Sequence, residues 1–118
     1  MGEHALIIHL DKIGECSEEI GMDPLDALVA LESRLRDVVE ASGIGVVDGH
    51  EIALDDSEGS LWLYGANAKA MLKVALPVLC PSPLAPGGRV LLRYGTSNDE
   101  AATEEIFSLA DLCARQNS

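Results

Sequence analysis

Aromatic residues are scarce in this 118-residue chain, at 3% of the sequence: Trp62, Tyr64, Tyr94 and Phe107. Hydrophobic residues still make up 47%, well above the range of disordered chains. We therefore expect a packed core built from Leu, Val, Ile and Ala. The length fits one domain, residues 1–118, which is large enough to fold without a disulfide or a metal.

Long apolar runs and targeting signals are also missing. No stretch approaches the roughly 18 residues that cross a bilayer, and Met1–His4 lacks the basic and apolar segments of a signal peptide. The three cysteines, Cys16, Cys80 and Cys113, are odd in number and widely spaced, unlike the dense even sets of secreted scaffolds. These features predict a cytoplasmic protein that does not contact membranes.

Motifs that carry catalysis or bind a cofactor are absent. Neither a Gly-x-Ser-x-Gly motif nor a phosphate-binding glycine loop occurs. Cys16 lies beside Glu15 and Glu18, and neighbouring carboxylates raise a thiol pKa, so it is a poor nucleophile. We expect a protein that is not an enzyme and that needs no cofactor.

Metal-ligand spacing is missing as well. His4 and His9 are five residues apart on an expected strand, which directs their side chains to opposite faces. Asp55-x-Ser57-x-Gly59 matches a fragment of a calcium loop but lacks the distal bidentate Glu, so a hydrated turn is the better interpretation. No metal site is predicted.

Basic residues are few, at 8 Lys and Arg against 20 Asp and Glu, which gives a net charge of −12. Two windows, 37–68 and 95–114, contain no Lys or Arg at all. Their acids are Asp37, Glu40, Asp48, Glu51, Asp55, Asp56 and Glu58 in the first, and Asp99, Glu100, Glu104, Glu105 and Asp111 in the second. Such a field repels nucleic acids and anionic lipids and attracts basic proteins.

The first half of the chain predicts a strand, a loop and a helix. His4–Leu10 is apolar on both faces, as in a central strand, and the polar segment 11–22 is expected to be a loop. A helix begins at the cap Asp23, followed by Pro24, and ends at Gly43. The residues expected on its buried stripe are Leu25, Leu28, Val29, Leu35, Val38 and Val39, with Leu31 at the edge; those expected on its outer face are Glu32, Arg36 and Glu40.

The second half predicts strands at 44–54, 60–64 and 89–94. Asp48-Gly49 indicates a bulge in the first, which pairs with the second across the turn 55–59; a true hairpin at Asp48-Gly49, adding a fifth strand, is the alternative. A helix begins at the cap Asn67 and is kinked or ended by Pro77. Capping-box spacing of Ser97 and Glu100 predicts a terminal helix over 99–114, packing Ile106, Leu109 and Cys113.

This order predicts an α+β fold: a ferredoxin-like split β-α-β sandwich, with a four-stranded antiparallel sheet, two helices on one face and a C-terminal helix.

Short pieces between Gly43 and Gly95 resemble a loose set of small bacterial ferredoxin-like proteins without an assigned function. The similar pieces are Asp48-Gly49, Glu51-Ile52-Ala53, Leu63-Tyr64-Gly65, Pro77-Val78-Leu79, Pro83-Leu84 and Leu92-Arg93-Tyr94-Gly95. In fold and charge the chain is also similar to immunity proteins, which neutralise the toxins of neighbouring bacteria. The first resemblance supports the fold, and the second implies binding to a basic toxin or nuclease.

Two functions follow from these features. The first is an acidic protein-binding domain, an immunity-type inhibitor, that contacts a basic partner through Glu51, Asp55, Asp56 and Glu58. The alternative is a homodimer or small-ligand module that uses the open sheet face around Trp62 and Tyr64, unless the terminal helix covers that face.

Overall fold

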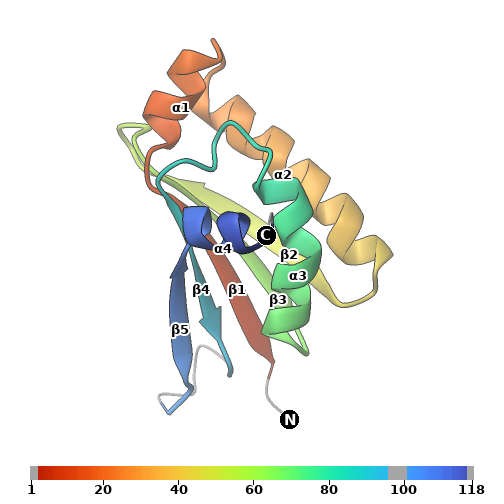
Figure 1. Ribbon diagram of the computed structural model, residues 1–118. Helices are drawn as coiled ribbons and strands as arrows, with labels where there is room; N and C mark the ends of the chain where they lie inside the picture. Colours follow the sequence, from red (N-terminus) through yellow and green to blue (C-terminus); the bar gives the residue numbers. More distant parts are fainter. Residues whose placement is uncertain (1–2, 96–100, 117–118) are drawn as a thin grey trace.

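The computed structural model describes residues 3–95 and 101–116 (Figure 1). It is an α+β structure with one five-stranded antiparallel sheet, in the order β2-β3-β1-β4-β5. The elements are β1 (His4–Leu10), α1 (Ile13–Glu19), α2 (Pro24–Ala41), β2 (Gly45–Ile52), β3 (Gly59–Gly65), α3 (Ala68–Leu79), β4 (Gly88–Arg93), β5 (Glu104–Ser108) and α4 (Leu109–Gln116). None of the helices in the described part of the chain has the length and apolarity needed to span a membrane.

The strand β1 lies at the centre of the sheet, as its two apolar faces predict, and pairs with β3 and β4. β2 is a single strand whose register with β3 shifts between Val47 and Gly49. The bulge predicted at Asp48-Gly49 is therefore confirmed, and the alternative hairpin at this site is wrong.

The predicted count of four strands is wrong, because residues 104–108 form β5 rather than part of a helix. Without β5, one edge of β4 would be unpaired. In addition, the β-branched Ile106 and the aromatic Phe107 favour a strand. Phe107 packs against the core, whereas Ile106 points to the other face and is 62% exposed. Of the predicted terminal helix, 109–114 is helical; Ser97, Asp99 and Glu100 lie outside the described residues.

The helix α2 has the predicted boundaries, with the Asp23 carboxylate accepting from the N–H groups of Leu25 and Asp26 and with Gly43 at a φ of 69°. Its predicted faces need correction. Leu25 and Val29 are more than 40% exposed, whereas Leu31 is 3% exposed and Glu32, expected outside, is 6% exposed. The buried stripe follows 28, 31, 35 and 39, and Glu32 borders it on the side of β2.

The segment 11–22 is not a loop, because it contains α1. Seven residues are too few for a clear helical period, so the sequence pattern missed this helix. Ile13 and Cys16 bury their side chains in the core, and this packing holds the helix in place.

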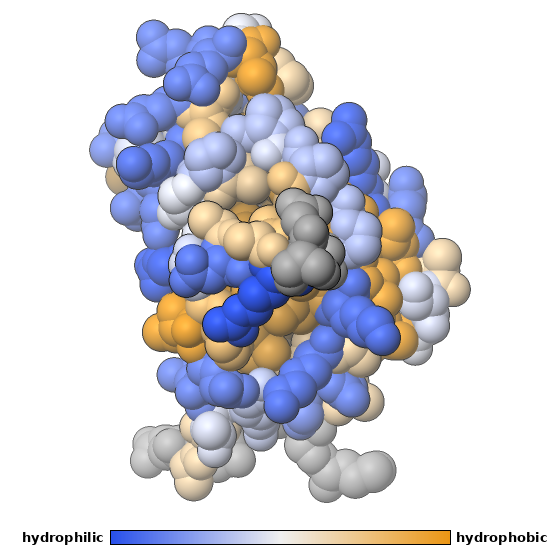
Figure 2. Space-filling model, in the orientation of Figure 1, coloured by the Kyte–Doolittle hydropathy of each residue, from blue (hydrophilic) through white to orange (hydrophobic). Residues whose placement is uncertain are grey.

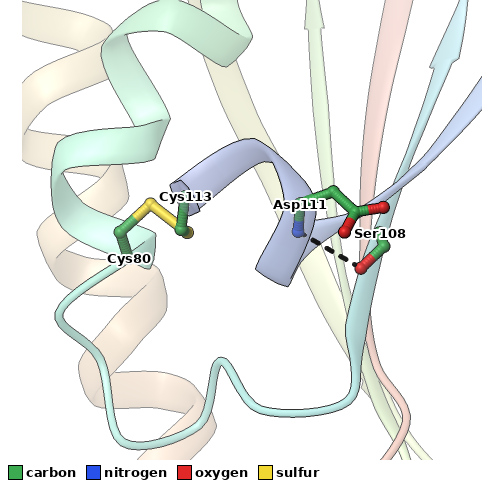
Figure 3. Close-up of a disulfide and its surroundings, with 4 residues drawn as sticks. All are labelled: Cys80, Ser108, Asp111 and Cys113. Carbon is green, nitrogen blue, oxygen red and sulfur yellow. Dashed lines mark hydrogen bonds between the residues drawn. A yellow bond between two sulfur atoms is a disulfide. The ribbon is translucent and has the colours of Figure 1, made fainter. Parts of the chain in front are cut away.

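All four helices pack on one face of the sheet. The core combines their apolar residues with the inward side chains of the strands, among them Leu6, Ile8, Leu61, Leu63, Val90 and Leu92. α3 continues past Pro77 to Leu79. α4 lies beside α3, and a disulfide joins Cys80 to Cys113, so α4 does not cover the opposite face of the sheet (Figures 1 and 3).

Candidate functional site

The turn between β2 and β3 carries a group of exposed carboxylates. Asp55 Oδ1 accepts hydrogen bonds from the Ser57 N–H at 3.0 Å and from the Ser57 hydroxyl at 2.6 Å. These bonds stabilise the charged form and lower the pKa of Asp55. Asp56 follows with a φ of 60°, which Asp tolerates better than most residues. The turn thus holds the Asp55 carboxylate in a defined geometry that favours its charged form.

The helix α1 brings a second group of acids to the same end of the molecule. The Gly14 N–H donates to the Ser57 carbonyl at 3.3 Å, and a Cβ on Gly14 would lie 2.9 Å from the Asp56 carbonyl oxygen. Only glycine allows the helix to approach the turn this closely. Between them lies an open hollow of about 740 Å³, whose lining includes Glu15 and Glu18.

We call this surface the acidic tip and define it by Glu15, Glu18, Glu51, Asp55, Asp56 and Glu58. All six are exposed, and none is ion-paired to a Lys or Arg in the described part of the chain. Figure 2 shows hydrophilic side chains gathered over α1 and the β2–β3 turn. Lys12 lines the hollow, as does Asp11, whose Oδ2 is 2.7 Å from the Nε of Arg89.

The second acidic window behaves differently. Glu104 pairs with Arg93, and Glu105 accepts a 2.6 Å hydrogen bond from the Tyr94 hydroxyl. Burial, together with this bond to Glu105, raises the pKa of Tyr94 to about 12. The two acids of β5 therefore have partners within the fold, a base for Glu104 and a hydroxyl donor for Glu105.

The face of the sheet opposite the helices is built of three rows that run across the strands. The central row contains Gly49, Trp62, Ile7, Leu91 and Ile106, and we call it the apolar row. One flanking row contains Val46, Tyr64, Ala5, Arg93 and Glu104, and the other contains Glu51, Ser60, His9, Arg89 and Ser108. An apolar band thus crosses the whole sheet between two more polar ones.

The two ends of the apolar row differ in shape. At the β5 end, Ile106 projects with 62% of its surface exposed. At the β2 end, Gly49 has no side chain, and a hollow of about 240 Å³ lies over it beside Trp62 and Tyr64. The buried Nε1 of Trp62 makes no hydrogen bond to the described residues, although Trp N–H groups usually find a partner. Burial, and then the charge of Asp48, raise the pKa of Tyr64.

His4 and His9 form hydrogen bonds within the fold. His4 Nδ1 accepts from the Ala68 N–H, and His9 Nδ1 is 3.1 Å from the Ser60 hydroxyl. Burial and then the nearby acids raise the pKa of Cys16, in the predicted direction. Among residues 3–95 and 101–116, no three His, Cys, Asp or Glu side chains are placed to hold a metal ion.

The predicted site residues form two groups. Glu51, Asp55, Asp56 and Glu58 share the β2–β3 hairpin, whereas Trp62 and Tyr64 lie farther along β3 on the open face. Glu15 and Glu18 were noted in the sequence only as neighbours of Cys16. The sequence alone does not show that these two acids lie beside a turn about forty residues away.

Comparison of the chain with protein families, with curated proteins and with solved structures gives no match. The resemblance to immunity proteins therefore stays a prediction.

Proposed function

We propose that this protein is a protein-binding domain that attaches to a basic partner through the acidic tip. One observation carries the proposal: six exposed carboxylates from α1 and the β2–β3 hairpin share one end of the molecule without a Lys or Arg ion partner in the described part of the chain. Charges held on a rigid turn cost little to reorganise on binding. Their common field speeds encounter with a cationic surface.

The form of this function that we favour is an immunity-type inhibitor of a basic toxin or nuclease. We assign the fold to the ferredoxin-like sandwiches with β5 added at the edge, and the strand order β2-β3-β1-β4 supports this proposal. An inhibitor of this kind acts by covering a cationic active site, so it needs no catalytic group of its own.

The test uses a basic toxin or nuclease encoded beside the gene for this chain. Its dissociation constant is measured by calorimetry at about 0.05 M and 0.5 M NaCl, where screening differs strongly. The tip variant combines Glu51→Gln, Asp55→Asn, Asp56→Asn and Glu58→Gln. Its control removes four exposed acids elsewhere, through Asp26→Asn, Asp37→Asn, Glu40→Gln and Asp111→Asn, so that the net charge of the two variants is equal.

We expect the tip variant to weaken binding by about a hundredfold at low salt and the control by about threefold, since only the tip contacts the partner. Equal binding by the two variants contradicts the proposal, as does a failure of the wild-type chain to bind. A nuclease activity assay with the same partner and the same variants measures inhibition.

The compartment is part of the proposal. The sequence favours the cytoplasm, whereas structural disulfides such as Cys80–Cys113 are typical of oxidising compartments. Trapping free thiols in intact cells before lysis determines the state of the pair. Two blocked thiols at Cys80 and Cys113 support the cytoplasm, and an intact bond supports an oxidising compartment.

A further inference from the structure

We infer that the open sheet face binds a second copy of this chain, forming a two-fold symmetric dimer through the apolar row. This inference concerns the face opposite the helices and is independent of the basic-partner proposal. Strands with one apolar face normally bury it against another layer. Here the four helices occupy one face only, and in the described part of the chain no element covers the other.

The two ends of the apolar row are complementary in shape. A two-fold axis along β1 at Ile7 exchanges the two ends of the row, so the projecting Ile106 of each copy meets the hollow over Gly49 of the other. The same axis sets Leu91 against Trp62, and Ile7, which is 5% exposed in the single chain, lies at the axis. A patch that fits itself in this way is what an isologous dimer requires.

The charges on the flanking rows agree with this arrangement. The acids Asp48 and Glu51 belong to β2, and the bases Arg89 and Arg93 belong to β4, on opposite sides of β1. The axis along β1 lays β2 of one copy over β5 of the other, next to β4. Glu51 then comes near Arg89 of the second copy, and Arg93, paired with Glu104 in its own chain, comes opposite Tyr64 of the second copy, where a cation–π contact can form.

The area is sufficient for a weak dimer. A face of five strands at about 4.8 Å spacing, seven residues long at about 3.4 Å each, offers about 600 Å² per copy. The total, about 1,200 Å², stands at the lower end of specific interfaces. We therefore expect a dissociation constant on the order of micromolar.

Two variants test the fit without disturbing the core. Gly49→Val fills the hollow, and a Cβ at this position meets no atom within 4 Å in the single chain. Ile106→Asp places a charge on the projecting residue. Leu54→Asp is the matched control for Ile106→Asp, because it also replaces an exposed apolar residue with Asp. Leu54 is 108% accessible and lies in the β2–β3 turn, away from the apolar row.

The measurements are sedimentation equilibrium over a range of concentrations and the emission of Trp62, the single tryptophan of the chain. We expect the wild type and Leu54→Asp to dimerise with a blue shift of the emission. Gly49→Val and Ile106→Asp should each raise the dissociation constant by about a hundredfold, because every interface contains the altered residue twice. Their unfolding transitions report whether each variant is folded.

The response of binding to added salt distinguishes this inference from the basic-partner proposal. Two copies of charge −12 repel each other, so added salt tightens the dimer, whereas it weakens binding to a basic partner. A wild-type chain that stays monomeric at about 1 mM and 0.5 M NaCl, where repulsion is screened, overturns the inference. So does a folded Gly49→Val chain that dimerises like the wild type.

Discussion

Glu32 in α2 and His50 in β2 meet beneath the sheet edge, with Glu32 Oε2 at 3.1 Å from His50 Nδ1. Residue Glu32 is 6% exposed. Its only other basic neighbour among the described residues is Arg36, at 3.9 Å. A buried carboxylate is costly unless its oxygens are hydrogen-bonded. The pair therefore fixes α2 on β2, the strand that leads into the acidic tip.

His50→Ala should lower the free energy of unfolding at pH 7 by about 1–3 kcal/mol, because the buried Glu32 oxygen loses its partner. Arg36→Ala is the control: its contacts with Glu32, Glu40 and the Val47 carbonyl are 3.5–3.9 Å long and come from a partly exposed side chain, so their loss should cost less than about 1 kcal/mol. Urea unfolding of the wild type, Glu32→Ala, His50→Ala and the Glu32→Ala/His50→Ala double variant gives the coupling energy. A coupling of zero contradicts the assigned role of the pair.

Short sequence patterns predict much of this fold correctly. The two apolar faces of β1 indicate its central position, and Asp23 with Pro24 marks the start of α2. These signals hold because they depend on the geometry of a few adjacent residues. The bulge at Asp48-Gly49 is of the same kind, since a flexible dipeptide inside an extended run favours it.

The remaining features depend on neighbours that are distant in sequence. β5 forms because β4 offers a free edge, and the apolar spacing of 106, 109 and 113 fits a helix as well as a strand followed by a helix. Cys80 and Cys113 are 33 residues apart, and nothing in their spacing indicates that α4 lies beside α3. The acidic tip likewise needs the fold to bring α1 to the turn.

Gly14 is the contact that builds the acidic tip, so Gly14→Ala should alter it. The added Cβ would lie 2.9 Å from the Asp56 carbonyl oxygen, and relieving this overlap should cost about 1–3 kcal/mol. Gly49→Ala is the matched control, because its Cβ meets nothing within 4 Å, and it should leave stability unchanged or raise it by up to about 1 kcal/mol. Amide shifts of residues 55–58 should move only in Gly14→Ala. The opposite order of stabilities contradicts this account of the turn.

The disulfide ties α4 to α3, and its loss should weaken the whole domain. In the chain-entropy description, a bridge across 33 residues contributes about 3–4 kcal/mol. The Cys80→Ala/Cys113→Ala variant should therefore unfold at lower urea concentration than the oxidised wild type. A reductant should lower the midpoint of the wild type and leave that of the variant unchanged. A wild-type midpoint that reductant does not move contradicts a stabilising role for the disulfide.

His9 should make stability depend on pH near neutrality. Burial, and then the positive charge of Arg89, lower its pKa below the usual value of 6.5, against the opposing charges of Asp11 and Glu58. The unfolded chain therefore binds a proton at a pH where the folded chain does not, so protonation favours unfolding. The free energy of unfolding should fall as pH drops through about 6.5 and level off below the folded pKa.

Urea unfolding across this pH range measures the effect as the difference between the wild type and His9→Gln, since His4 and His50 are present in both chains. The Cε1 proton resonance of His9 gives the folded pKa directly, and Arg89→Gln should raise it by removing the second cause. Because His9 lies in a row flanking the apolar row, both titrations are made at a concentration where the chain is monomeric. A folded pKa at or above about 6.5 reverses the sign of the linkage and contradicts the prediction.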